Sequence, residues 1–201
     1  MTDLLNRPDF EVIAGWVQPG ERVLDLGCGD GALLKLLIET RGARGYGVDI
    51  DDRNVLAAIS NGINVIQSNL DAGLAGFVDG AFDHVVLSRT LQTIRHTREI
   101  LGAMLRVGRE AVVSFPNFGY WKNRLAVLGG RMPVSEDLPF QWFDTPNVRF
   151  FTMLDFEALC EEMDILVRER QVLDEQGKLV MEEHNFLGSL AVYRVTRVSQ
   201  T

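Results

Sequence analysis

Apolar residues recur along this chain in two alternating patterns: spacings of three and four, which predict amphipathic helices, and short unbroken runs, which predict buried strands. The first helical face consists of Phe10, Ile13, Ala14 and Val17, and Pro19 with Gly20 ends that helix. Strand-like runs follow at residues 22–26, 45–49, 64–67, 82–87 and 110–115. Helical patterns at 32–38, at 53–61 and up to about residue 106 separate them, and residues 71–79 are expected to be looped or weakly helical. This alternation predicts a parallel sheet with helices on both faces.

The pattern changes after Pro116. A helix is predicted at 120–128, and an irregular stretch follows to residue 151. Thr152 and Asp155 can form a capping pair for a helix that runs to about residue 163. Strands at 165–173 and 190–195 predict an antiparallel hairpin at one edge of the sheet. The expected fold class is α/β, with a seven-stranded, mostly parallel, Rossmann-like sheet, in one domain over 1–201 with an insertion at about 116–151.

Composition and charge narrow the class of protein. The 201 residues are 46% hydrophobic and 24% charged, as is ordinary for a globular domain. A formal net charge of −8, with no cluster of Lys or Arg, argues against nucleic acid as a partner, because such binding depends on neutralising phosphates. The first ten residues hold three charged side chains and no apolar run typical of a signal peptide, and no later stretch reaches membrane-spanning length. We therefore expect a cytoplasmic protein with no membrane partner. Two cysteines, Cys28 and Cys160, support neither a disulfide framework nor a thiolate metal cluster, so no metal is expected.

Residues 24–31, Leu-Asp-Leu-Gly-Cys-Gly-Asp-Gly, place a strand-terminal carboxylate directly before three glycines. Such a turn lets the backbone approach an adenosine-containing cofactor, although it can also be only a tight strand-to-helix turn. Gly27, Gly29 and Ala32 also satisfy the dinucleotide fingerprint, which keeps a nicotinamide-dependent oxidoreductase as an alternative. Asp25 and Asp30 would repel a diphosphate but attract the sulfonium and ammonium groups of S-adenosylmethionine. The charges therefore favour the cationic cofactor.

Polar residues also stand at the ends of the following strands. Asp49 ends the second strand and can accept both ribose hydroxyls, or it can be a helix cap, as can Asp51 and Asp52. Asn69 can accept from an adenine amino group while the Leu70 N–H meets a ring nitrogen; the alternative for Asn69 is an Asx turn. Because the carboxyl ends of parallel strands meet at one edge, these residues are expected to converge. The predicted cofactor-binding residues are Asp25, Gly27, Cys28, Gly29, Asp49, Ile50, Asn69, Leu70 and Ser88.

The glycine turn, Asp49, Ser-Asn-Leu-Asp at 68–71 and Phe-Asp-His-Val-Val-Leu-Ser at 82–88 resemble the successive motifs of class I S-adenosylmethionine-dependent methyltransferases. The resemblance covers about residues 15–115 and implies a seven-stranded methyltransferase sheet with S-adenosylmethionine or S-adenosylhomocysteine as the cofactor. By analogy, Asp25 and the glycines hold the methionine portion, Asp49 the ribose, and Asn69 with Leu70 the adenine. Many members carry Asp where this chain has Asn69, and an amide is the poorer acceptor.

A narrower resemblance extends through most of the chain. Leu-Ser-Arg-Thr-Leu-Gln at 87–92, Ser-Phe-Pro-Asn-Phe-Gly-Tyr-Trp at 114–121 and Trp-Phe-Asp-Thr-Pro-Asn-Val-Arg-Phe-Phe-Thr at 142–152 look like motifs of the MetW family of methionine biosynthesis. This resemblance implies a protein that works beside homoserine O-acyltransferase (MetX) in forming O-acylhomoserine, usually the succinyl ester. It implies no methyl acceptor. A small-molecule methyltransferase remains the alternative, so whether the protein is an enzyme stays open, as does a homo-oligomer.

Nine of the 17 aromatic residues lie between 115 and 151. Three explanations fit this density: a lid over an apolar crevice, a protein interface, or an extra layer of core. Catalytic residues are harder to find, because no paired acid and base, triad or metal cluster stands near the predicted cofactor site. Tyr120 and His96 are the candidates, and neither supports an assignment, so the catalytic residues are unknown.

Overall fold

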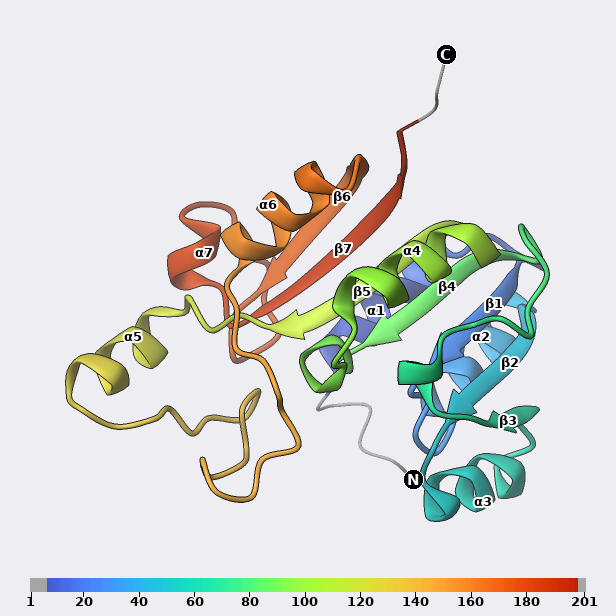
Figure 1. The fold of residues 1–201 in the computed structure, drawn as a ribbon, viewed down its shortest axis with the longest axis horizontal. Helices are drawn as coiled ribbons and strands as arrows, with labels where there is room; N and C mark the ends of the chain where they lie inside the picture. Colours follow the sequence, from blue (N-terminus) through green and yellow to red (C-terminus); the bar gives the residue numbers. More distant parts are fainter. Residues whose placement is uncertain (1–6, 199–201) are drawn as a thin grey trace.

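The computed structural model describes residues 7–198 and forms one seven-stranded sheet in the order β3-β2-β1-β4-β5-β7-β6 (Figure 1). The strands are β1 Arg22–Leu26, β2 Arg44–Asp49, β3 Val65–Gln67, β4 Phe82–Ser88, β5 Gly108–Pro116, β6 Ile165–Leu173 and β7 Leu190–Arg197. The helices are α1 Pro8–Trp16, α2 Ala32–Arg41, α3 Asp52–Ser60, α4 Thr97–Val107, α5 Trp121–Leu128, α6 Met153–Glu162 and α7 His184–Leu187. Residues 1–6, part of the N-terminal stretch expected to lack a signal sequence, lie outside the described residues.

The sheet has the mixed topology that the sequence predicts. Strands β1 to β5 pair in parallel, and β7 pairs antiparallel with both β5 and β6. The predicted hairpin therefore forms one edge of the sheet, with β6 outermost. Among the helices of residues 7–198, none is both long and apolar enough to cross a bilayer.

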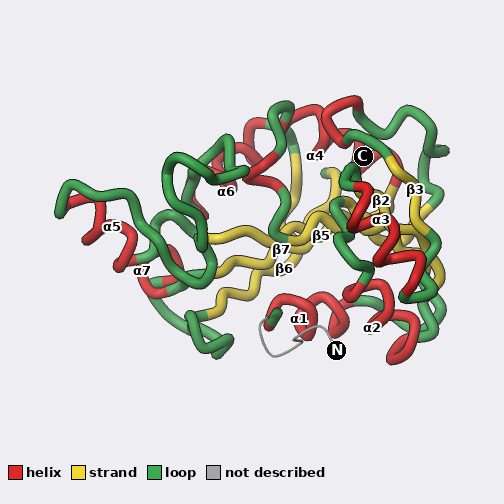
Figure 2. Tube along the Cα trace, turned by 90° about the horizontal axis from the view of Figure 1, so that it is seen from below, coloured by secondary structure: helices red, strands yellow, loops and turns green. Residues whose placement is uncertain are grey.

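Helices cover both faces of the sheet because the strands are apolar on both sides. In β1, Val23 packs with α1 and α2 whereas Leu24, on the opposite face, packs in the core with α4 and α6. Figure 2 shows α1 and α2 below the sheet and α4 and α6 above it. Phe115 lies in the core between the sheet and helices α4 and α6, and it stacks on Tyr193 with ring centroids 5.7 Å apart.

Two local predictions differ from the structure. The helix predicted after β4 begins only at Thr97, because residues 91–93 form a separate 3-10 turn and Arg89 takes a left-handed backbone conformation, with φ of 49°. The connection between β6 and β7 includes the short helix α7. The polar sequence of this connection did not predict a helix. The capping box of Thr152 and Asp155 is confirmed, with the side chain of each accepting from the backbone of the other.

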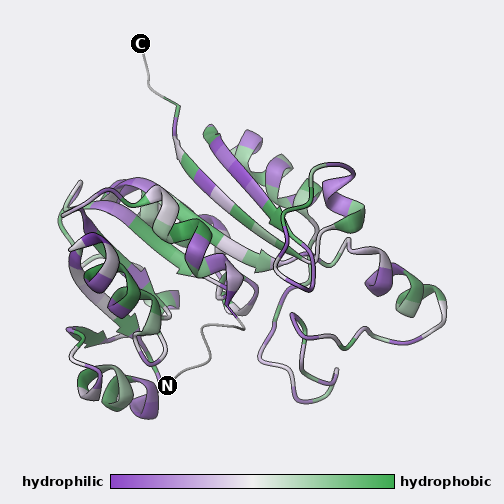
Figure 3. Ribbon diagram, turned by 180° about the vertical axis from the view of Figure 1, so that it is seen from behind, coloured by the Kyte–Doolittle hydropathy of each residue, from purple (hydrophilic) through white to green (hydrophobic). Residues whose placement is uncertain are grey.

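Residues 121–150, which we call the arm, extend from the carboxyl end of β5 away from the sheet (Figure 1). The arm begins with α5 and continues as an irregular chain that returns to α6. Hydrophobic residues occur along the arm as well as in the sheet (Figure 3). The aromatic residues that precede and follow the arm belong to the core: Phe115 and Phe151 pack with centroids 4.7 Å apart.

Candidate functional site

The glycine turn folds over the end of the neighbouring strand. The N–H groups of Gly27 and Cys28 donate to the carbonyl of Val48, at 2.7 and 3.0 Å. Gly27 has φ of 71°, and a Cβ at this position would lie 2.7 Å from Oγ1 of Thr90. Glycine is therefore required at position 27 for two reasons: its backbone is left-handed, and Thr90, just after the end of β4, approaches too closely for a side chain.

A cavity of about 110 Å³ opens at this turn. Its lining residues are Arg7, Phe10, Asp25, Gly27, Cys28, Gly29, Asp30, Ala32, Leu33 and Ser88. Five of the residues predicted to bind the cofactor therefore meet around one cavity, and the other four do not line it. Ligand pockets for whole drug-sized molecules measure roughly 300–1,000 Å³. This cavity has room for a group the size of an amino acid, and a nucleoside attached to it would extend outward over β2 and β3.

Asp25 is the most deeply buried charged group of the cavity, with 2% of its surface exposed. Among residues 7–198, no donor forms a hydrogen bond with its carboxylate. The pKa of Asp25 is raised to about 7, mainly by burial; Arg7 lowers it, and the nearby carboxylates of Asp49 and Asp9 add to the rise. A buried carboxylate without a hydrogen-bond donor is costly unless a cation arrives to pair with it.

Arg7 is a site residue that sequence reasoning missed. It precedes α1, and its guanidinium bonds the Asp9 carboxylate at 3.1 Å and the Ser88 hydroxyl at 2.6 Å. It also lies over the ring of Phe10, 4.0 Å from the centroid. No sequence signal could have found this arginine, because the contact joins positions that are 81 residues apart.

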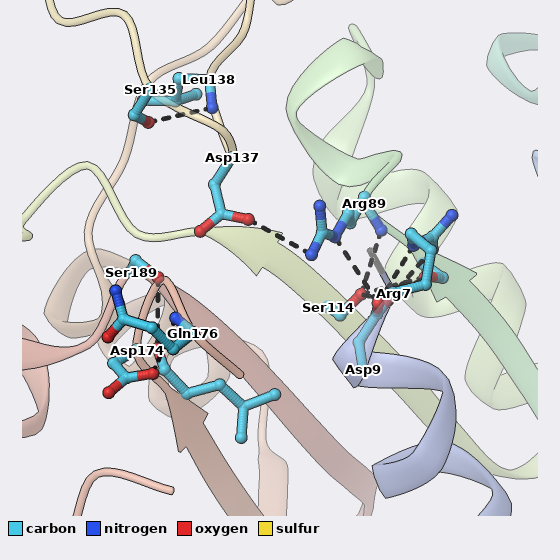
Figure 4. A network of polar contacts seen from close by, with 12 residues as sticks. Arg7, Asp9, Arg89, Ser114, Ser135, Asp137, Leu138, Asp174, Gln176 and Ser189 are labelled. Atoms are coloured by element: carbon cyan, nitrogen blue, oxygen red, sulfur yellow. Dashed lines mark hydrogen bonds and ion pairs between the residues drawn. The ribbon is translucent and has the colours of Figure 1, made fainter. Parts of the chain in front are cut away.

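Asp9 is the centre of a buried polar network at the carboxyl ends of β4 and β5 (Figure 4). Its Oδ2 accepts from the hydroxyls of Ser88 at 2.5 Å and Ser114 at 2.9 Å. Although burial opposes ionisation, the guanidiniums of Arg7 and Arg89 with Ser88 outweigh it and lower the pKa of Asp9. The hydroxyl of Ser88 is thus committed to Asp9 and Arg7, so Ser88 positions the wall of the cavity.

Asp49 links the glycine turn to β2. Its carboxylate accepts from the N–H of Gly29 at 2.8 Å, the N–H of Asp51 at 3.0 Å and the side-chain amide of Asn54 at 3.2 Å. The cap of α3 is Asp51, which accepts from the N–H of Arg53. The helix-cap alternative for Asp49 is therefore wrong, while the expectation of a cap at Asp51 is confirmed.

The polar residues after β3 are arranged differently from those after β1. Oδ1 of Asn69 accepts from the N–H of Asp71 at 2.9 Å and caps a 3-10 turn, Leu70–Ala72, which is the Asx-turn alternative. A carbonyl oxygen has a second lone pair, so this bond leaves one site for a further donor. The N–H of Leu70 donates no hydrogen bond within the described part of the chain. Ile50 is exposed beside this region.

The N-terminus of α2 already has a carboxylate. Oδ1 of Asp30 accepts from the N–H of Ala32, the first residue of the helix, at 3.1 Å. An anion placed at this helix end would meet both Asp30 and Asp25 in the same cavity. The arrangement supports the prediction that the turn disfavours a diphosphate.

Neither catalytic candidate lies at the cavity. Tyr120 is buried beside Lys122, near the arm, where burial and then the charge of Glu175 raise its pKa. His96 is exposed at the N-terminus of α4, 3.9 Å from a carboxylate oxygen of Asp71. Burial, with the charges of Asp25 and Asp49, raises the pKa of Cys28 to about 12, so this thiol is a poor nucleophile. Within residues 7–198 no group of three His, Cys, Asp or Glu side chains is placed to hold a metal ion.

Several solved structures with this fold are described as S-adenosylmethionine-dependent methyltransferases, and one from Rhodobacter sphaeroides is described as a putative zinc-dependent alcohol dehydrogenase. One from Mesorhizobium loti superposes with a TM-score of 0.70 at 15% identity, covering 94% of this chain and 98% of that one. One from Archaeoglobus fulgidus gives 0.67 at 17% identity, covering 98% of this chain and all of that one. The fold is therefore that of this methyltransferase class. Residues 7–195 match the family model described as methionine biosynthesis protein MetW, and the chain belongs to the MetW family.

Curated relatives include a protein that contains MetW and a methyltransferase. The bifunctional methionine biosynthesis protein MetXA/MetW of Rhodopirellula baltica is 36% identical over 195 residues, covering 92% of this chain and 31% of that protein. Ribosomal protein L11 methyltransferase of Neisseria meningitidis is 34% identical over 128 residues, covering 62% of this chain and 39% of that protein. The chain thus spans less than two fifths of the length of either relative.

Proposed function

We propose that the protein binds S-adenosylmethionine or S-adenosylhomocysteine at the carboxyl edge of β1, β2 and β4. The observation that carries this proposal is the buried Asp25 carboxylate, which faces a cavity of amino-acid size and has no hydrogen-bond donor among residues 7–198. The ligand's ammonium group would pair with Asp25, and its carboxylate would meet the guanidinium of Arg7 on the same cavity. Opposite charges at these two positions suit a zwitterionic amino-acid group.

The nucleoside would lie outside the cavity, over the ends of β2 and β3. Asp49 retains one lone-pair site, on Oδ2, for a ribose hydroxyl, since three donors occupy three of the about four sites of a carboxylate. The N–H of Leu70, which has no partner among residues 7–198, would donate to an adenine ring nitrogen, and the exposed Ile50 would pack against the base. In this arrangement Gly27, Cys28 and Gly29 provide the backbone surface along the ligand.

We further propose that the protein supports a homoserine O-acyltransferase of the MetX type in forming O-acylhomoserine. Membership of the MetW family supports this role, as does the relative whose single chain carries MetXA and MetW together. Fusion keeps two proteins at a high effective concentration, as would benefit proteins that act together. S-adenosylmethionine derives from methionine, so binding it would let the pathway's product influence the acylation step.

The test is an acyltransferase assay with purified MetX from the same organism, with and without this protein and S-adenosylhomocysteine. We expect the rate of O-acylhomoserine formation to rise when the protein is added and to respond to the ligand. A rate that is unchanged under all conditions would overturn the supporting role. Calorimetric titration of the ligand in the same samples tests the binding proposal separately.

The alternative function is methyl transfer to a small molecule, favoured by the methyltransferase fold and by the convergence of Asp25, Gly27, Gly29 and Ser88 on one cavity. Methyl transfer requires a base that takes the proton from the methylated group. Asp9 is held ionised, but its carboxylate already accepts hydrogen bonds from two serine hydroxyls. Incubation with radiolabelled S-adenosylmethionine, homoserine, its esters and cell extract distinguishes the functions. A labelled small-molecule product would favour methyl transfer.

A further inference from the structure

The arm exposes an unusual amount of apolar surface. Of 24 large hydrophobic side chains that are exposed in the described part of the chain, ten lie within residues 125–150. The aromatic residues among them include Trp142 and Phe143, which are 71% and 69% exposed and form an edge-to-face pair with centroids 5.7 Å apart. Aromatic clusters of this size on a surface mark interaction sites.

The arm is held in place at several points, so its aromatic surface is presented by a defined structure. Lys122 forms an ion pair with Glu175 at the start of the arm. Asp137 pairs with Arg89 at 3.2 Å, which connects the middle of the arm to the Asp9 network (Figure 4). The N–H groups of Val148 and Arg149 both donate to the carbonyl of Gln92. A surface that is ordered before binding loses less conformational entropy when a partner docks.

The end of the arm continues into a concave region. Val148, Arg149 and Phe150 line a cavity of about 690 Å³ between α4 and α6, together with Arg95 and Arg98. None of the residues predicted to bind the cofactor lines this cavity. Three arginines beside aromatic side chains match the composition of protein interfaces, in which arginine and large aromatic residues dominate the binding energy.

We propose that the arm, with the cavity at its end, is the surface that binds the homoserine O-acyltransferase. This inference rests on the proposed function and adds the location of the contact. The family match over residues 7–195 includes the whole arm, and so the arm belongs to the unit that the Rhodopirellula protein joins to MetXA. A contact surface on the MetW unit would hold it beside MetX, as fusion does in that relative.

The charges favour the acyltransferase over a second copy of this chain. Arg95, Arg98 and Arg149 outnumber the two carboxylates that line the cavity; Arg98 pairs with Glu162, and Asp155 is used in the capping box. A two-fold dimer through this surface would bring the same arginines close to one another. The expected occupant is therefore a patch of the acyltransferase with apolar and acidic side chains.

The test compares the double variant Trp142→Ser/Phe143→Ser with the matched control Leu56→Ser/Ile59→Ser. The control side chains lie on α3 and are similarly exposed, at 65% and 57%. We expect the arm variant to lower the affinity for MetX at least about 30-fold, the threshold of a binding hot spot, and the control to leave it unchanged. Affinity for S-adenosylhomocysteine is expected to stay within about twofold in both variants, because none of the four residues lines its cavity.

Hydrogen exchange of the wild-type complex gives a second measurement that does not depend on variants. Protection of residues 131–150 when MetX is added supports the inference. Equal MetX binding by wild type and arm variant, with no protection of the arm, overturns the location but leaves the supporting role intact. Wild-type protein that neither binds nor stimulates MetX overturns both. Self-association that the arm variant abolishes would show that a second copy covers this surface.

Discussion

At the scale of single residues, Asp25 determines how the site responds to pH. Its pKa of about 7 in the free protein, raised mainly by burial, means that the carboxylate is largely protonated at pH 6 and ionised at pH 8. A cationic ligand pairs with the ionised form, so affinity is present above pH 7 and is lost as the pH falls. We expect the dissociation constant for S-adenosylhomocysteine to rise about tenfold from pH 8 to pH 6.

Isothermal titration calorimetry between pH 5.5 and 8.5 measures this profile. The variant Asp25→Asn should bind more weakly and show a flat profile, because an amide does not titrate. A wild-type affinity that is independent of pH would show that the ligand's ammonium does not pair with Asp25.

Asp49 carries a second residue-scale prediction. Asp49→Ala removes the expected acceptor for the ribose, and a bond to a charged group contributes roughly 1.5–3 kcal/mol. The affinity for S-adenosylhomocysteine should therefore fall at least about tenfold in a calorimetric titration.

The control for Asp49 is Asp51→Ala, two residues away. Asp51 caps α3, so its loss should cost about 1 kcal/mol of stability and leave ligand affinity unchanged. If Asp49→Ala binds as tightly as wild type, the ribose assignment is wrong.

At the scale of elements, the hydrophobic pattern was sufficient to predict the bounds of helices and strands that have an amphipathic or fully apolar sequence of their own. Strands β1 and β6 begin and end at their predicted residues. The left-handed conformation of Arg89 could not be predicted, since it depends on bonds from its N–H to Ser114 on the neighbouring strand. The burial of Asp9 also departs from the usual pattern, because its partners come from positions 88, 89 and 114.

Helix α6 gives a test of an element that the sequence did predict. The hydroxyl of Thr152 caps the helix, which buries Phe156 in the core where the arm returns to the sheet. Thr152→Ala should lower the free energy of unfolding by about 1 kcal/mol in urea titrations. Thr40→Ala is the control, because its hydroxyl only bonds back to Leu36 within α2. Equal stability of the two variants would contradict the role of the cap.

At the scale of the whole molecule, the parallel topology brings the site together. Asp25 and Ser88 lie at the carboxyl ends of the neighbouring strands β1 and β4, and β2 flanks β1 on its other side. Residues more than sixty positions apart therefore share one cavity. The sequence predicted a parallel sheet but not the order of its strands. A parallel sheet is enough, however, to place the carboxyl ends of the strands at one edge. Arg7 and the Asp9 network were not predictable, because they depend on how α1 packs across the finished sheet. The arm was identified in the sequence by the many aromatic residues between 115 and 151. In the structure some of these residues, such as Phe115, are buried in the core, and others, such as Trp142 and Phe143, are exposed.

The last prediction concerns the stability of the folded chain as a whole. A ligand that binds only the folded state at about 100 times its dissociation constant stabilises it by about 2.7 kcal/mol. For a domain of this size, that stabilisation corresponds to a rise in Tm of about 5–10 °C. Differential scanning fluorimetry should show this rise with S-adenosylhomocysteine, and no rise with a nicotinamide dinucleotide at the same concentration. The diphosphate would meet Asp30 at the N-terminus of α2 and Asp25 in the cavity, and neither carboxylate can donate a hydrogen bond to it when ionised. A rise with the dinucleotide alone would instead favour an oxidoreductase.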